Sequence, residues 1–237
     1  MALPRINETL NFTMTIPSTG QKVKYRPYLV KEEKVLLQAF ESGDTKTCLE
    51  AMADTLSACI DANENVDVSS LATFDVEYMF VKVRSQSVGE TSRVQIKCAE
   101  CQTPNTVVIP LDEVEIDVKK DDAVIPITDN ISVEMRYPTY RTLMENDLSG
   151  DAENMDTAMS VLAGSVAAVL TDEERIDASE QSTKEMVEFL SSMTTGQLQS
   201  LSDFLEKMPA LKHDIEFSCE ECQHENKLEL KGLSDFF

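Results

Sequence analysis

Apolar and polar side chains alternate near the start of the chain, in the period-two pattern of a half-buried β-strand. The apolar positions before residue 17 are Leu10, Phe12, Met14 and Ile16. Residues 17–20, Pro-Ser-Thr-Gly, are typical of a turn, and alternation returns over residues 21–28. We therefore predict a β-hairpin over residues 8–30.

Helical spacing follows the hairpin. Residues 31–40 predict a helix, and we expect its buried side to be formed by Val35, Leu36, Leu37 and Phe40. Asp44 can cap a second helix that runs to about residue 60. Its apolar face holds Cys48, Met52, Leu56 and Cys59, and we interpret these two cysteines as small buried apolar residues. A third helix is predicted from Thr73 or Asp75 to about Gly89.

The period changes back to two after residue 91. Strands are predicted on both sides of a first cysteine turn, and further β structure at residues 114–118, 124–127 and 131–135. Helices are predicted at residues 139–148, 155–170, 183–192 and 196–208, before two strands flank a second cysteine turn. The order indicates an α+β fold in which β-hairpins and a four-cysteine zinc-knuckle β unit combine with about six α-helices.

These boundaries suggest a division of the chain into five regions. They are an N-terminal β-hairpin (1–30), a helical region (31–90), a β region with the first zinc knuckle (91–138), a helical insertion (139–210), and the second zinc knuckle with the C-terminal tail (211–237). We expect one compact domain in which residues 1–138 and 211–237 are joined by the metal.

The candidate metal-binding residues lie in an internal repeat of the sequence. The octapeptide Cys98-Ala-Glu-Cys-Gln-Thr-Pro-Asn105 returns 121 residues later as Cys219-Glu-Glu-Cys-Gln-His-Glu-Asn226, with Cys, Glu, Cys, Gln and Asn in register. Two Cys-x-x-Cys pairs supply the ligands of a tetrahedral zinc site. We predict one structural zinc per chain, held by Cys98, Cys101, Cys219 and Cys222.

Other uses of these cysteines are less well supported by the sequence. A redox pair favours a lowered thiol pKa, whereas glutamates lie between the cysteines of each pair and should disfavour a thiolate. An iron–sulfur cluster and disulfides remain alternatives, and His224 could replace one thiol as a ligand. A closed four-cysteine shell leaves no open coordination position, so the predicted metal is structural rather than catalytic.

Charge and composition narrow the function classes further. The formal net charge is −22, from 43 acidic and 21 basic residues, which opposes nucleic-acid binding. The acidity serves either solubility or complementarity to a basic protein partner. No run reaches the roughly 18 apolar residues of a membrane span, and the N-terminus lacks the apolar core of a signal peptide. We found no phosphate-binding loop, His-Glu-x-x-His pair or Gly-x-Ser-x-Gly motif, so we do not expect an enzyme.

Three segments carry a resemblance to a known family. Residues 15–34 (TIPSTGQKVKYRPYLVKEEK) and 73–90 (TFDVEYMFVKVRSQSVGE) resemble the baseplate hub subunit of T4-type contractile-tailed phages, and the terminal LSDFF at residues 233–237 looks similar as well. The resemblance implies a baseplate hub subunit or a hub assembly protein without enzyme activity. It also implies protein partners: other hub or tail proteins, the tape measure, or further copies of the chain.

The resemblance places the protein in the host cytoplasm during assembly and then in the tail baseplate of the virion. An assembly chaperone absent from the finished particle and a zinc-ribbon nucleic-acid-binding protein are alternatives. Phe236 and Phe237 at the end of the chain either form a docking peptide for a partner or fold back onto the protein's own core.

Overall fold

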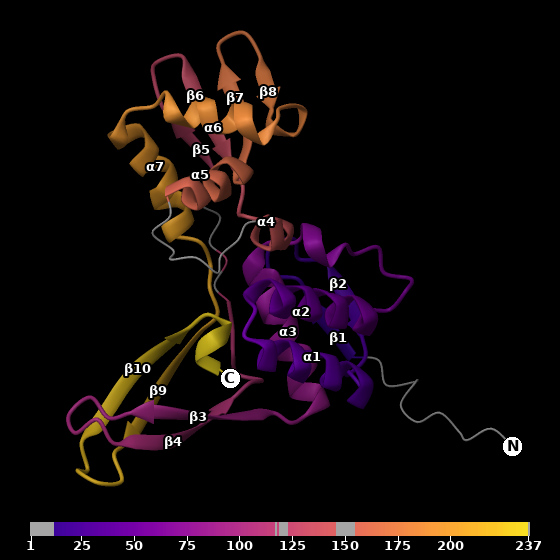
Figure 1. Cartoon of the computed structure of the whole chain (residues 1–237), viewed down its shortest axis with the longest axis vertical. Helices are drawn as coiled ribbons and strands as arrows, with labels where there is room; N and C mark the ends of the chain where they lie inside the picture. The colour runs from indigo at the N-terminus through magenta and orange to yellow at the C-terminus, as the bar shows by residue number, and fades with distance from the viewer. Residues whose placement is uncertain (1–11, 117, 119–122, 146–154, 237) are drawn as a thin grey trace, which may run out of the picture.

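The computed structural model describes residues 12–116, 118, 123–145 and 155–236. Side chains gather into three hydrophobic clusters within these residues. Figure 1 shows the corresponding units: a helical unit that contains the first hairpin, a sheet covered by helices, and a pair of crossing hairpins. The predicted α+β fold is confirmed, with seven α-helices and several small antiparallel sheets in the described residues.

The helical unit contains the hairpin and the three helices that follow it. Its elements are β1 (Phe12–Thr15), β2 (Lys22–Tyr25), α1 (Val30–Ser42), α2 (Thr45–Cys59), η1 (Val68–Ser70) and α3 (Thr73–Ser87). The strands pair from Phe12 with Tyr25 to Thr15 with Lys22, as predicted. Asp44 caps α2 by accepting a hydrogen bond from the Thr47 N–H at 2.9 Å, and it ends the chain reversal that follows α1.

Helix α1 buries a narrower side than we predicted. Leu36 and Ala39 are buried, but Val35, Leu37 and Phe40 are 50%, 55% and 48% exposed. The prediction that all of these apolar residues face the core is wrong, because three consecutive helical residues span about 200° and cannot share one face. Helix α1 therefore presents a second apolar side away from α2.

The second unit is a four-stranded antiparallel sheet in the order β5-β6-β7-β8. Its strands are β5 (Val124–Pro126), β6 (Ile131–Met135), β7 (Val166–Thr171) and β8 (Arg175–Asp177). The other elements of this part of the chain are α4 (Tyr140–Glu145), α5 (Met155–Gly164), η2 (Ala178–Glu180), α6 (Thr183–Ser191) and α7 (Thr195–Glu206). Helix α4 packs through Tyr140 on the helical unit. Because β6 pairs with β7, this sheet crosses the division we expected at residue 138.

The prediction of one helix over residues 155–170 is wrong. Helix α5 ends at Gly164, and β7 begins at Val166, which pairs with Met135 of β6. A Cβ at position 164 would lie 2.9 Å from Cγ2 of Thr142, so glycine allows the end of α5 to approach α4 closely. After this break Val166, Ala168 and Val169 are buried, and Val166 and Val169 belong to the hydrophobic cluster of this unit.

The third unit brings the middle of the chain and its end together. It contains β3 (Thr91–Lys97), β4 (Pro104–Pro110), β9 (Lys212–Ser218), β10 (Glu225–Lys231) and η3 (Leu233–Phe236). The two hairpins are separate two-stranded sheets that cross each other (Figure 1). Val107, Ile109, Ile215 and Leu230 form part of the cluster between them. The strand predicted at residues 114–118 is reduced to a bridge between Glu115 and Lys212, and residue 117 lies outside the described residues.

Candidate metal centre and apolar groove

The tips of the two crossing hairpins bring the four predicted cysteines together. The sulfurs of Cys98, Cys101, Cys219 and Cys222 all lie within 4.8 Å of one another. Cys98 and Cys219 are buried, whereas Cys101 and Cys222 are exposed. The hairpins that carry them are far apart in the sequence, so the fold rather than local chain geometry forms this cluster.

The distances between the sulfurs fit a tetrahedral thiolate centre. The Sγ atoms of Cys98 and Cys222 are 3.7 Å apart, and those of Cys101 and Cys219 are 3.6 Å apart. A zinc–sulfur bond of about 2.3 Å in a regular tetrahedron requires sulfurs about 3.8 Å apart. A disulfide would need about 2.05 Å, and all four cysteines are free thiols.

Each turn is closed by the same backbone pattern. In the first turn, Cys98 N–H donates to the Thr103 carbonyl at 2.9 Å, and Gln102 N–H donates to the Cys98 carbonyl at 3.0 Å. The second turn repeats both bonds with the same lengths, from Cys219 N–H to His224 and from Gln223 N–H to Cys219. The two glutamines have positive φ angles of 61° and 60°, which closes the turn around the sulfurs.

Backbone N–H groups point at one sulfur of each turn. The N–H of Cys101, with that of Glu100, lowers the pKa of Cys98 to about 6. The N–H of Cys222 likewise lowers the pKa of Cys219. Our expectation that neighbouring glutamates would disfavour a thiolate did not take these N–H groups into account.

The exposed sulfur of Cys222 behaves differently. The His224 N–H favours the Cys222 thiolate, but contacts with the sulfurs of Cys101 and Cys219 outweigh it and raise the pKa of Cys222 to about 12. Four neighbouring sulfurs cannot all carry negative charge without a cation. The donor set therefore suits a soft divalent cation that would neutralise them.

Two asparagines join the turns across the cluster. The Asn105 side-chain amide lies 3.7 Å from the Cys219 sulfur, and its Oδ1 accepts from the Glu220 N–H at 2.9 Å. Asn226 repeats this arrangement in the opposite direction, 3.6 Å from the Cys98 sulfur and 2.9 Å from the Ala99 N–H. The two asparagines occupy equivalent positions of the sequence repeat, and this recurrence is the signal from which their shared role could have been predicted.

The remaining candidate ligands lie outside the cluster. In the described part of the chain, the potential metal-binding group contains cysteines only, and His224 is exposed and contributes backbone bonds. Cys59 is buried, which raises its pKa to about 11. The Cys48 thiol contacts the Ala39 carbonyl at 3.3 Å. Both cysteines pack in or against the helical unit.

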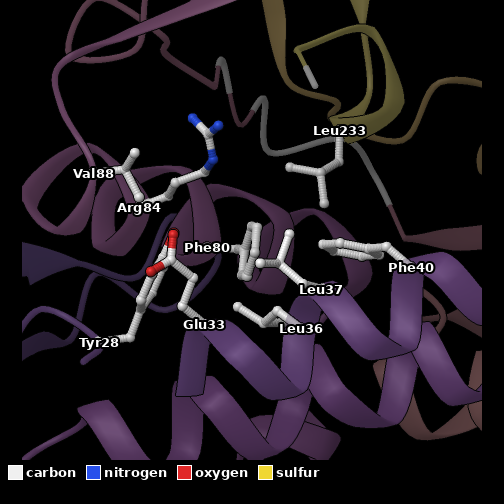
Figure 2. A pocket seen from close by; sticks show the side chains of 9 residues that line it. All are labelled: Tyr28, Glu33, Leu36, Leu37, Phe40, Phe80, Arg84, Val88 and Leu233. Carbon is white, nitrogen blue, oxygen red and sulfur yellow. The ribbon is translucent and has the colours of Figure 1, made fainter. Parts of the chain in front are cut away.

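A groove lies on the second apolar side of α1. Figure 2 shows Leu37 and Phe40 of α1 on one side and Leu233 of η3 across from them, with Phe80 of α3 beside Leu37. The groove has a volume of about 580 Å³. Its lining consists of Tyr28, Glu33, Leu36, Leu37, Phe40, Phe80, Arg84, Val88 and Leu233. The lining is thus almost entirely apolar, with one acidic and one basic side chain.

The terminal phenylalanines do not both fall within the described residues. Phe236 is fully buried in the cluster between the hairpins, because η3 turns the end of the chain back against β3 and β10. Phe236 thus folds back onto the protein's own core, which is one of the two alternatives stated for the terminal phenylalanines. A buried side chain offers no exposed contact to a partner. Phe237 lies outside the described residues.

The comparison with protein families gives one match that spans nearly all of the chain. The family described as T4 bacteriophage base plate protein matches residues 8–237. This chain belongs to that family. No curated protein and no solved structure matches the chain.

Membership in the T4 bacteriophage base plate protein family confirms the resemblance to a T4-type baseplate protein. It implies contacts with other baseplate proteins and a place in the virion tail. Among the described residues, no helix combines the length and apolar character needed to cross a membrane.

Proposed function

We propose that this baseplate-family chain is a non-enzymatic structural or assembly protein of the baseplate hub that acts through protein–protein contacts. The family match over residues 8–237 is the observation that carries this proposal. A closed four-thiolate shell supports it, since such a shell leaves no coordination position for a substrate.

The metal that fits the cysteine cluster best is zinc, one ion per chain, in a structural role. Sulfur separations of 3.6 and 3.7 Å support this choice, as do the soft donors. Zinc would fix the crossing of the hairpins and so connect residues near 100 with residues near 220. Metal analysis of the purified chain by native mass spectrometry should give one zinc per chain. Iron, or no metal, would contradict the assignment.

We propose the apolar groove of α1, α3 and η3 as the partner-binding surface. Its occupant would be an apolar segment on a positively charged region of another baseplate protein. The exposed Leu37 and Phe40 favour such an apolar contact. A net charge of −22 disfavours a second copy of this chain and favours a basic partner.

Paired substitutions test the groove. The variant with Leu37→Ser and Phe40→Ser should bind its baseplate partner at least about tenfold more weakly, since apolar anchors carry much of the free energy of an interface. Val108→Ser is the matched control, because Val108 is 52% exposed on β4 and lies outside the groove. Affinity would be measured by titration against individually purified baseplate proteins at two salt concentrations. Unchanged affinity in the groove variant would exclude this surface.

A second experiment separates a component from an assembly factor. Quantitative mass spectrometry of purified tails detects the chain if it stays in the baseplate and misses it if it acts as an assembly chaperone. A mobility-shift assay at low salt tests the nucleic-acid-binding alternative, which the net charge opposes.

A further inference from the structure

We infer that Asn105 and Asn226 are reciprocal positioning residues for the metal centre, each completing the ligand environment of the opposite hairpin. The inference rests on the metal centre of the proposed function. It adds that neither hairpin holds its cysteines in the binding geometry without an asparagine from the other.

The first argument is the direction of the contacts. Asn105 follows the first cysteine pair, yet its amide group reaches the sulfur of Cys219 and the N–H of Glu220 in the second turn. Asn226 follows the second pair and reaches the sulfur of Cys98 and the N–H of Ala99 in the first turn. Each asparagine thus contacts the buried cysteine of the other hairpin and the backbone of the residue that follows this cysteine.

The second argument is that each asparagine side chain is buried and forms hydrogen bonds through both its carbonyl oxygen and its N–H₂ group. Asn105 and Asn226 are each 3% exposed. Their side-chain N–H₂ groups also donate within their own turns, at 2.8 Å to the Thr103 carbonyl and at 3.1 Å to the His224 carbonyl. A buried amide with its donors and its acceptor in use has a fixed orientation, because losing any one bond leaves a buried polar atom unpaired.

The third argument concerns the thiolates. A metal-bound thiolate carries negative charge, and an N–H donor that points at it forms a charge-assisted hydrogen bond. Such partners of metal ligands orient the ligand and tune its basicity. Aspartate has nearly the shape of asparagine and keeps the acceptor for the backbone N–H, but it replaces the donor near sulfur with negative charge. The asparagine amide provides both the donor and the acceptor in one planar group.

These contacts also explain why the hairpins cross where they do. In the described residues β3–β4 and β9–β10 share no strand ladder with each other. Near the tips, the two asparagines supply direct hydrogen bonds from one turn to the backbone of the other. They therefore place the cysteine pairs opposite one another independently of the metal.

The test compares Asn105→Asp and Asn226→Asp with the wild-type full-length chain. Zinc affinity is measured by competition with a chromophoric chelator. We expect each substitution to weaken zinc binding by about 10- to 100-fold, the range for lost outer-shell partners of metal ligands. The two losses should be similar, because the two sets of contacts mirror each other. Gln95→Ala is the control, since among the described residues the side chain of Gln95 bonds to Thr106 of its own hairpin, and it should leave zinc affinity unchanged.

Unchanged affinity in both aspartate variants, with zinc bound by the wild type, would overturn this inference and leave the proposed metal centre intact. No zinc binding by the wild type would overturn both. Should the variants fail to fold, hydrogen exchange on the wild-type, zinc-loaded chain decides. The amides of Ala99 and Glu220 should be protected as strongly as the strand amides of β4, and exchange at the rate of an open loop would refute the contacts.

Discussion

Replacing Phe236 with alanine distinguishes a core residue from a docking residue. Phe236 is fully buried between the hairpins, only one residue from the end of the sequence. A phenylalanine buries about 150–250 Å², which corresponds to about 4–6 kcal/mol at roughly 25 cal/mol per Å². This value is an upper bound, because an unfolded chain already hides part of that area.

The expected loss for Phe236→Ala is therefore about 3 kcal/mol, the lower end of measured Phe→Ala changes in cores. The lower end applies because the last turn can relax into part of the space. For a chain of this size the melting temperature should fall by about 6–12 °C. The assay is urea unfolding followed by circular dichroism, with thermal melts as a second measure.

Leu228→Ala serves as the control, because Leu228 lies in the same hairpin unit but is 39% exposed. It should cost less than about 0.5 kcal/mol. If Phe236→Ala costs as little as the control, Phe236 is not part of the core in solution. A stable variant that fails to join tails would instead support the docking role expected from the sequence alternative.

Two further predictions concern charge and metal. Burial raises the pKa of Glu77 from 4.5 to about 7. Between pH 4.5 and pH 7, Glu77 is therefore protonated in the folded state and ionised in the unfolded state. The contribution of Glu77 to the free energy of unfolding therefore falls as pH rises from about 4.5 to 7. Glu77→Gln should be more stable than the wild type at pH 8 and equally stable at pH 4, as measured by urea unfolding. A difference in urea midpoints that is the same at both pH values would refute this. Cys219→Ser should lose the zinc in metal analysis and lower the melting temperature, while Cys48→Ser should keep it; full zinc content in Cys219→Ser would rule out one shared centre.

The sequence predicted those features that depend on local pattern. Period-two alternation located the first hairpin, and the cysteine repeat located two turns with the same backbone. It also indicated that the pairs share a site, because four soft ligands suit one ion. The recurrence of Asn105 and Asn226 was equally visible, but their crosswise contacts depend on how two distant hairpins meet.

Features that depend on tertiary contacts were missed. Strand β7 follows α5 after a single residue, and its Ala and Val residues fit either helix or sheet until β6 provides a partner. The groove combines α1 with Leu233, almost two hundred positions later in the chain. Apolar spacing on α1 could not reveal that Val35, Leu37 and Phe40 are exposed, whereas Leu36 is buried.

The late position of β9 and β10 has a consequence for synthesis. The hairpin β3–β4 is translated before Ile215, Leu230 and Phe236, which cover its apolar side and lie about one hundred or more residues later in the chain. A nascent or truncated chain must carry this uncovered β surface, which is prone to aggregation and attractive to proteases. Covering that surface therefore depends on residues 212–236, because Ile215, Leu230 and Phe236 belong to the same cluster as the apolar residues of β4.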